Sequence, residues 1–138
     1  MKLVTKQELH ARPSGTIYSS YQGNDPWRQE LFTDLHVKGD SLPCKGRQFD
    51  FVTTPLLPSL SSDSAGGIDF LWSTSREGTF DDSMVYWVWD ELDRQRLAHA
   101  LLDPGNRHLW SGTTRVTSDS FDIRFPYGDL EICSKGAA

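Results

Sequence analysis

The sequence predicts an α+β domain: a mainly antiparallel sheet of about five to seven strands with two helices, about residues 6–11 and 91–102, packed on it. Three observations support this fold class. Short stretches alternate apolar and polar residues, as half-buried strands do. Most connections between them are too short for the helical crossovers that parallel strands need. Two segments carry helix start and stop signals. Since 138 residues fit one domain, we expect a single domain over residues 1–138.

The first predicted helix begins at a capping box. The Thr5 hydroxyl can accept a hydrogen bond from the Glu8 backbone N–H, and the Glu8 carboxylate can reach back to Thr5. Val4 and Leu9 occupy the two positions of a hydrophobic staple. Pro13 ends the helix, which is too short to be stable without tertiary contacts.

The second predicted helix begins at Asp90, a good N-cap, and ends at the Asp-Pro-Gly-Asn turn that follows residue 102. The pairs Leu97/Leu101 and Ala98/Leu102 are four residues apart. We expect this stripe to pack on the sheet.

The strands are predicted from β-branched and aromatic residues bounded by turn signals. They are expected at 16–21, 31–37 (ended by Gly39-Asp40), 47–53, 68–73, 84–89, 121–125 and 130–133, with short irregular strands at 109–110 and 113–116. The stretch 84–89 is apolar on both faces, which is typical of a central strand.

Within 47–53, Phe49 and Phe51 should point inward, and Gln48 and Asp50 outward. Serine-rich residues 59–67 are predicted to be a flexible loop, and residues 103–138 an irregular C-terminal extension.

The charge distribution favours a basic protein partner over a nucleic acid. The net charge is −5, and the segment from Glu77 to Asp93 contains six acidic residues and no Lys or Arg. Such a segment repels phosphate backbones and attracts basic surfaces. The alternative is a solvated acidic face that only aids solubility. Asp81 and Asp82 beside Glu77 offer oxygen ligands to a divalent cation, but their spacing does not match an EF-hand loop.

No catalytic or metal-binding motif is present. Gly-x-Ser-x-Gly, His-Glu-x-x-His and the P-loop pattern are absent, and the four histidines lack paired metal spacing. Cys44 and Cys133 form no Cys-x-x-Cys motif, although a single disulfide stays open. We expect no metal and no cofactor. An enzyme using His36 or His108 with nearby carboxylates remains an alternative.

The N-terminal residues become charged at once and lack the apolar core of a signal peptide, and no stretch approaches 18 apolar residues. These features predict a cytoplasmic protein with reduced thiols and no membrane contact.

The five tryptophans divide into two groups. Trp72, Trp87 and Trp89 lie in predicted strands and are expected in the core. Trp27 and Trp110 lie in loop-like segments, where an aromatic side chain either anchors a partner or folds back over the edge of the core.

Several segments carry a resemblance to a known class of proteins. They are Leu3-x-Thr5-x-x-Glu8-Leu9, Gly15-Thr16-Ile17-Tyr18, residues 35–40, and residues 76–82 with the aromatic strand and helix that follow. Over roughly residues 1–102 the chain resembles small cytosolic bacterial immunity proteins of toxin–immunity systems. The resemblance implies a small, often acidic protein that binds a cognate toxin and blocks its active site.

The sequence therefore predicts a non-enzymatic protein-binding protein, an immunity protein that neutralises a toxin with a basic surface. An acidic surface can steer association with such a cleft and give specificity. The residues expected to bind the partner are Glu77, Asp81, Asp82, Asp40 and Trp110. The alternatives are a structural or adaptor subunit of phage or secretion machinery, or a small hydrolase-like enzyme. The oligomeric state is left open.

Overall fold

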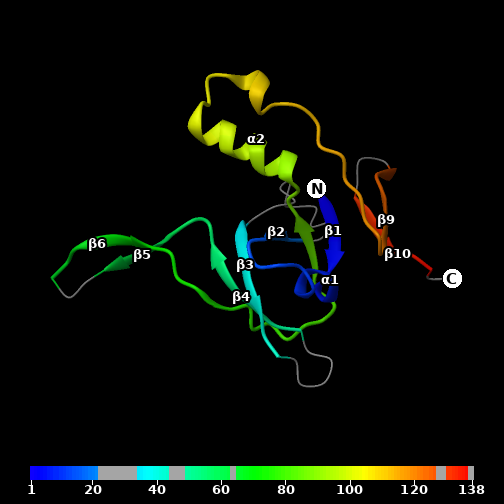
Figure 1. The fold of residues 1–138 in the computed structure, drawn as a ribbon, viewed down its shortest axis with the longest axis horizontal. Helices are drawn as coiled ribbons and strands as arrows, with labels where there is room; N and C mark the ends of the chain where they lie inside the picture. The colour runs from blue at the N-terminus through cyan, green and yellow to red at the C-terminus, as the bar shows by residue number, and fades with distance from the viewer. Residues whose placement is uncertain (22–33, 44–48, 63–64, 127–129, 137–138) are drawn as a thin grey trace.

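A six-stranded antiparallel sheet organises the chain in the computed structural model, which describes residues 1–21, 34–43, 49–62, 65–126 and 130–136 (Figure 1). Its strands are, in spatial order, β1 (Lys2–Thr5), β8 (Val85–Val88), β2 (Ile17–Ser20), β3 (His36–Ser41), β4 (Phe51–Pro55) and β7 (Ser75–Arg76). Each neighbouring pair is antiparallel. The chain is thus an α+β protein with a mainly antiparallel sheet and two α-helices, as the sequence predicts.

Strand β8 is buried on both faces, in agreement with its apolar sequence. It lies between β1 and β2. Tyr86 and Val88 point to one face, where they join a core cluster with residues of β1, β2, β4 and α1. Trp87 points to the opposite face and packs with Leu3 and Leu130 in a second cluster. The alternation of side chains along a strand is what lets one strand supply both cores.

The first face is covered by the short helix α1 (Lys6–His10). Thr5 and Glu8 form the predicted capping box, with the Glu8 backbone N–H donating to Thr5 Oγ1 at 3.1 Å. Val4 and Leu9, the two staple residues, are both fully buried in the same cluster. A five-residue helix is not stable alone, so its burial of Leu9 against the sheet keeps it folded.

The opposite face is covered by the hairpin of β9 (Phe121–Arg124) and β10 (Glu131–Ser134). Phe121, Ile123 and Ile132 pack against the cluster around Trp87. The backbone of Leu3 donates a 2.9 Å hydrogen bond to Thr117, which leads into this hairpin. Within the predicted C-terminal extension, both expected strands therefore form.

Helix α2 (Glu91–Leu102) has the predicted bounds, but it stands beside the sheet rather than lying flat on it (Figure 1). Asp90 caps it as expected, accepting from the Asp93 backbone N–H at 3.0 Å. The expected packing stripe is wrong for three of its four residues, because Ala98, Leu101 and Leu102 are exposed and only Leu97 is partly buried. The helix is followed by the 3-10 helix η1 (Arg107–Leu109), which packs against it. Among the described residues, no helix combines the length and apolarity needed to cross a bilayer.

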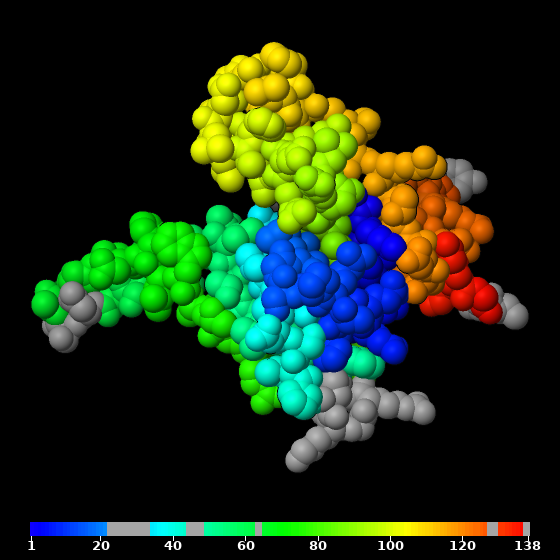
Figure 2. Space-filling view, in the orientation of Figure 1, coloured from blue at the N-terminus to red at the C-terminus, as the bar shows by residue number. Residues whose placement is uncertain are grey.

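A second two-stranded sheet, β5 (Ser59–Ser62) with β6 (Ile68–Leu71), leaves the body as an arm (Figures 1 and 2). We call the described residues 56–62 and 65–72 the arm. The prediction of a flexible loop over 59–67 is wrong for Ser59–Ser62, which form a strand. Serines are weak strand formers, but the apolar partner strand β6 supplies the cross-strand contacts.

Other predictions need correction where long-range contacts override local signals. Strand β1 precedes α1, and β3 continues through Gly39-Asp40 instead of ending there. The β3–β4 register shifts between Lys38 and Ser41, a bulge at which the closest approach of Val52 leaves little room for a side chain on Gly39. Residues 109–110 and 113–116 form no strand.

Asp50, expected to point outward, is buried because it holds Arg76 and the turn after β7. Its carboxylate lies 2.5 Å from an Arg76 terminal nitrogen and accepts the Gly78 backbone N–H at 3.1 Å. The predictions for Trp27, Cys44, Gln48 and residues 31–33 lie outside the described residues.

A pair of matched substitutions tests this packing. Leu9→Ala removes a fully buried side chain and should lower the free energy of unfolding by about 2–5 kcal/mol. Leu101→Ala makes the same chemical change in a helix at a side chain that is 74% exposed, and should change it by less than about 0.5 kcal/mol. Urea unfolding followed by circular dichroism measures both. A large loss for Leu101→Ala would contradict the exposed position of α2.

Candidate functional site

The predicted acidic surface loses its first member to the interior. The Glu77 side chain is only 7% exposed, and its carboxylate lies 2.7 Å from the Lys6 ammonium, which is fully buried. The Tyr86 hydroxyl donates to the same carboxylate at 3.1 Å, and Lys6 also donates to Thr79 at 3.0 Å. Burial, with the nearby Glu77 charge, raises the pKa of Tyr86. Glu77 therefore ties α1 to β8.

Asp81, Asp82 and Asp40 are exposed, as a partner-binding role requires. Asp81 accepts hydrogen bonds from the backbone and hydroxyl of Ser83, which lower the pKa of its carboxyl. Asp82 accepts the Phe49 backbone N–H at 3.2 Å. Asp40 accepts the Ser14 hydroxyl at 2.6 Å. Each carboxylate organises a turn or strand end and keeps a side open to solvent.

The remaining acids of the segment lie at the other end of β8. Asp90 and Asp93 each approach the α-amino group of Met1 at 2.6 Å. The hydrogen bond from this ammonium lowers the pKa of Asp90 to about 2. The four residues of β8 separate the two groups of acids by more than about 10 Å at ~3.3 Å per residue. Because this exceeds the Debye length of about 8 Å, the segment does not act as one field.

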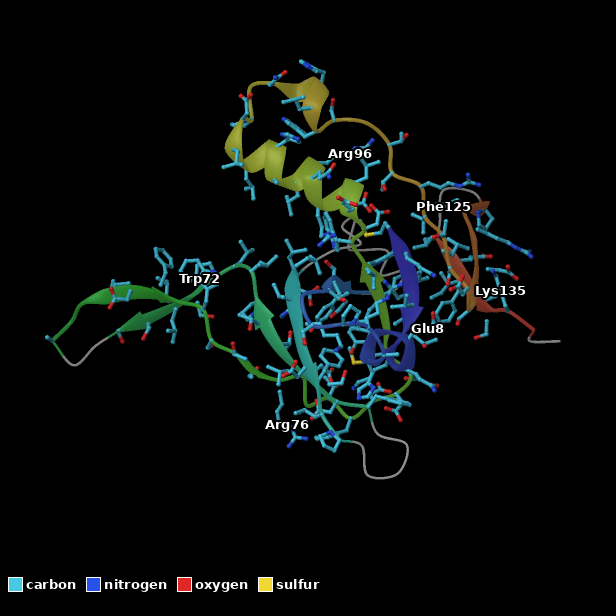
Figure 3. The ribbon with its side chains drawn as sticks, in the orientation of Figure 1. Glu8, Trp72, Arg76, Arg96, Phe125 and Lys135 are labelled. Atoms are coloured by element: carbon cyan, nitrogen blue, oxygen red, sulfur yellow. The ribbon has the colours of Figure 1, made fainter. Side chains whose placement is uncertain are left out.

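Trp110 lines a mostly apolar groove of about 410 Å³ between α2 and residues 110–114. Its indole N–H donates to the Pro104 carbonyl at 3.3 Å, and the Arg107 guanidinium lies 5.9 Å from its ring. Arg96, labelled in Figure 3, spans from α2 to the Thr113 carbonyl at 2.7 Å. The ring thus folds back onto its own loop while one part remains accessible, and it lies on a different element from Asp40, Asp81 and Asp82.

His36, the residue expected to act in a hydrolase, is partly buried in the sheet, with 24% of its side chain exposed. Its Nδ1 lies 3.4 Å from the Thr53 hydroxyl and its Nε2 3.3 Å from the Asp34 carboxylate. The ring stacks on Tyr18 at 5.3 Å, and the Tyr18 hydroxyl bonds to Thr53 at 2.6 Å. The Thr53 side chain is buried, and these contacts join β2, β3 and β4.

The other candidate residues for catalysis or metal binding lie on different elements. His108 and Cys133 are exposed, on η1 and β10 respectively. Within the described ranges, no three metal-ligating side chains come close enough to hold a metal ion.

The most distinctive surface is the arm, because its two faces differ in chemistry. Residues that pair across an antiparallel ladder point to the same face. One face carries the pairs Leu60/Phe70 and Ser62/Ile68. The other carries the pairs Ser59/Leu71 and Ser61/Asp69. We call the first the apolar face. Sequence reasoning missed it because residues 59–62 read as a loop, although the apolar alternation of Ile68 and Phe70 was visible.

The apolar face is open to solvent. Leu60, Ile68 and Phe70 are 70%, 72% and 66% exposed. Trp72, expected in the core, lies instead half-exposed at the base of the arm, where its indole N–H donates to the Leu56 carbonyl at 3.0 Å (Figure 3). An isolated two-stranded hairpin is at best marginally stable in water, and a covering element is what such hairpins need.

The exposed hydrophobic side chains also indicate that the arm presents an uncovered apolar surface. Among the described residues, more large hydrophobic side chains are exposed than are buried in the core. The arm and α2 project from the body and account for many of them (Figure 2). The described residues of the arm and α2 thus leave many large hydrophobic side chains in contact with solvent.

Comparisons with known proteins add no relative. No protein-family model, curated protein or solved structure matches the chain. The resemblance to immunity proteins is therefore untested by them.

The buried ion pair makes a stability prediction. Glu77→Gln leaves the Lys6 ammonium buried without its countercharge, which should lower the free energy of unfolding by about 3–5 kcal/mol. Asp81→Asn removes an exposed carboxylate and should change it by less than about 0.5 kcal/mol. Combining Lys6→Met with Glu77→Gln should recover part of the loss. Denaturant unfolding measures all three, and equal stability of the two single variants would contradict the buried position of Glu77.

Asp34 and Asp50 predict how stability depends on pH. Burial alone would raise the pKa of each, but hydrogen bonds outweigh it: from His36 and Ser20 to Asp34, and from Gly78 and Arg76 to Asp50. Because both folded-state pKa values are lowered, their stabilisation is full above the unfolded value of 3.8 and is lost as pH falls through the lower folded values.

Unfolding free energies measured between pH 6 and pH 2 should therefore fall steeply below about pH 4. Asp50→Asn should be less stable at pH 6 and should lose less on acidification. An unchanged slope in this variant would contradict the role given to Asp50.

Proposed function

We propose that this chain is a non-enzymatic protein-binding protein whose main binding element is the arm. The observation that carries the proposal is the apolar face, formed by Leu60, Ile68 and Phe70 on a hairpin that projects from the body. A soluble monomer rarely leaves such a contiguous patch exposed unless it binds something. Its position on a projecting element makes it accessible to another protein without rearrangement of the core.

The free energy gained by burying the apolar face favours its use as a docking surface. Burying a Leu, Ile or Phe side chain stabilises by about 1.5–3 kcal/mol, so covering the apolar face contributes several kcal/mol before the entropy of association is subtracted. Trp72 at the base adds an aromatic residue of the kind enriched at binding hot spots. The serine-rich opposite face keeps the arm hydrated on one side and gives the interaction a direction.

The class of partner expected from the resemblance, a toxin with a basic cleft met in the bacterial cytoplasm, is part of this proposal as its narrower form. Its support is the exposure of Asp40, Asp81 and Asp82. Glu77 contributes to stability instead, so charge reversal is informative only at the exposed positions. In this form the arm supplies the apolar contact, and the exposed carboxylates contribute steering that salt weakens.

Affinity capture with matched variants tests the proposal. Tagged wild-type protein is incubated with lysate of its source cells at low and high salt, and retained proteins are quantified by mass spectrometry. Leu60→Ser/Phe70→Ser should retain at least about tenfold less of the stoichiometric partner, the effect of losing 1.4 kcal/mol or more. Leu71→Ser alters the other face of the arm and should retain it as the wild type does.

Asp81→Lys/Asp82→Lys addresses the toxin form. If the partner is a toxin held by charge, this variant and high salt both release it. Retention that is unchanged in Leu60→Ser/Phe70→Ser would contradict the arm as the binding element. Thermal unfolding should be the same in the arm variants and the wild type, since the arm lies outside both core clusters.

A further inference from the structure

We infer that the occupant of the apolar face is a second copy of this chain: two arms stack face to face about a two-fold axis and form a small four-stranded sandwich. This inference rests on the proposed function, since it names the partner of the same arm, and it is an alternative to the narrower form in which a toxin covers that face. Two observations carry it. They are the charge distribution over the two faces of the hairpin and the area that the apolar face presents.

The apolar face is neutral, so it can meet its own copy without bringing like charges together. Among the described residues of the arm, Asp69 is the one with a formal charge, and it pairs with Ser61 on the opposite face. In a two-fold dimer each patch contacts the identical patch, so a charge on the contact face would be doubled. The position of Asp69 leaves that carboxylate in water when two apolar faces stack.

The face is also large enough for a weak specific dimer. With Trp72, whose exposed side chain continues the alternation at the base, the exposed apolar side chains amount to roughly 500 Å² per copy. Two copies would bury roughly 1,000 Å², the lower limit for a specific interface.

Stacking fits the geometry better than pairing along the strand edges. Edge-to-edge pairing would extend the ladder but leave Leu60, Ile68 and Phe70 in water. Face-to-face stacking places two sheets about 10 Å apart and covers these side chains from both arms. Because the arm extends away from the body, two arms can overlap while the bodies lie at opposite ends (Figures 1 and 2).

The central pair Leu60/Phe70 should dominate the contact. It lies in the middle of the four-pair ladder, between Ser62/Ile68 towards the tip and Ser59/Leu71 towards the base. Central, fully desolvated apolar residues carry most of the energy of an interface. Leu71 provides the control, since it is an exposed leucine of the same strand that points to the other face.

Sedimentation velocity of the full chain from about 1 to 500 μM tests the inference, a range suited to an interface of this size. The wild type should shift from the monomer mass to twice that mass and stop there. Leu60→Ser/Phe70→Ser should remain monomeric over the whole range, a shift of about 10,000-fold in the midpoint concentration if each of the four side chains lost per dimer contributes tenfold. Leu71→Ser should associate like the wild type.

Hydrogen exchange of the wild type provides a second readout that does not depend on a variant. The backbone amides of β5 and β6 should become protected as the concentration rises, while those of α2 should not change. Near-ultraviolet circular dichroism of each variant checks that the core is intact.

A wild type that is monomeric at every concentration would overturn the inference. So would association that Leu60→Ser/Phe70→Ser leaves unchanged, growth beyond the dimer, or protection confined to α2 and its exposed Leu101 and Leu102. The proposed function fails separately: if the chain is monomeric but the arm variant loses a different protein in the capture experiment, the arm binds that protein and the function stands. If the arm variant behaves as the wild type in both experiments, both proposals fall.

Discussion

The structure depends on the burial of β8 from both sides. Tyr86 and Val88 complete the core under α1, and Trp87 completes the core under the β9–β10 hairpin. The same strand pairs with β1 on one edge and β2 on the other, and its Trp87 packs against Leu130 from the C-terminal part of the chain. Three layers result: α1, the sheet and the C-terminal hairpin. The helix α1 and the C-terminal hairpin are each too small to fold alone. Each packs against buried side chains that β8 supplies.

This arrangement explains where the charged residues go. The segments before and after β8 carry acidic residues, and several of these contact basic groups of distant elements. Glu77 neutralises the buried ammonium of Lys6, while Asp90 and Asp93 surround the α-amino group of Met1. What looks like one acidic run in the sequence becomes separate structural contacts, with Asp81 and Asp82 left exposed between them.

The arm differs from the body because its apolar residues are exposed. It belongs to neither core cluster, yet it carries an apolar face whose side chains no described residue covers. A surface of this kind is expensive in water and is maintained where a partner covers it. The contrast between a closed body and an open arm is what supports the proposal of protein binding, and the uncharged apolar face is what supports the proposal of a second copy as the partner.

Local signals were enough for several elements. The capping box at Thr5 and Glu8, the bounds of α2 and the two-sided burial of β8 follow from residues that lie close together in the chain. The positions of Glu77, Asp50 and Leu101 do not, because each depends on a distant element. Lys6 of α1 pairs with Glu77, and Arg76 pairs with Asp50. Leu101 is exposed because this end of α2 does not pack on the sheet. The apolar residues of the arm can also be recognised in the sequence. Whether Phe70 is buried or exposed depends on the tertiary structure, because the six-stranded sheet forms without β6.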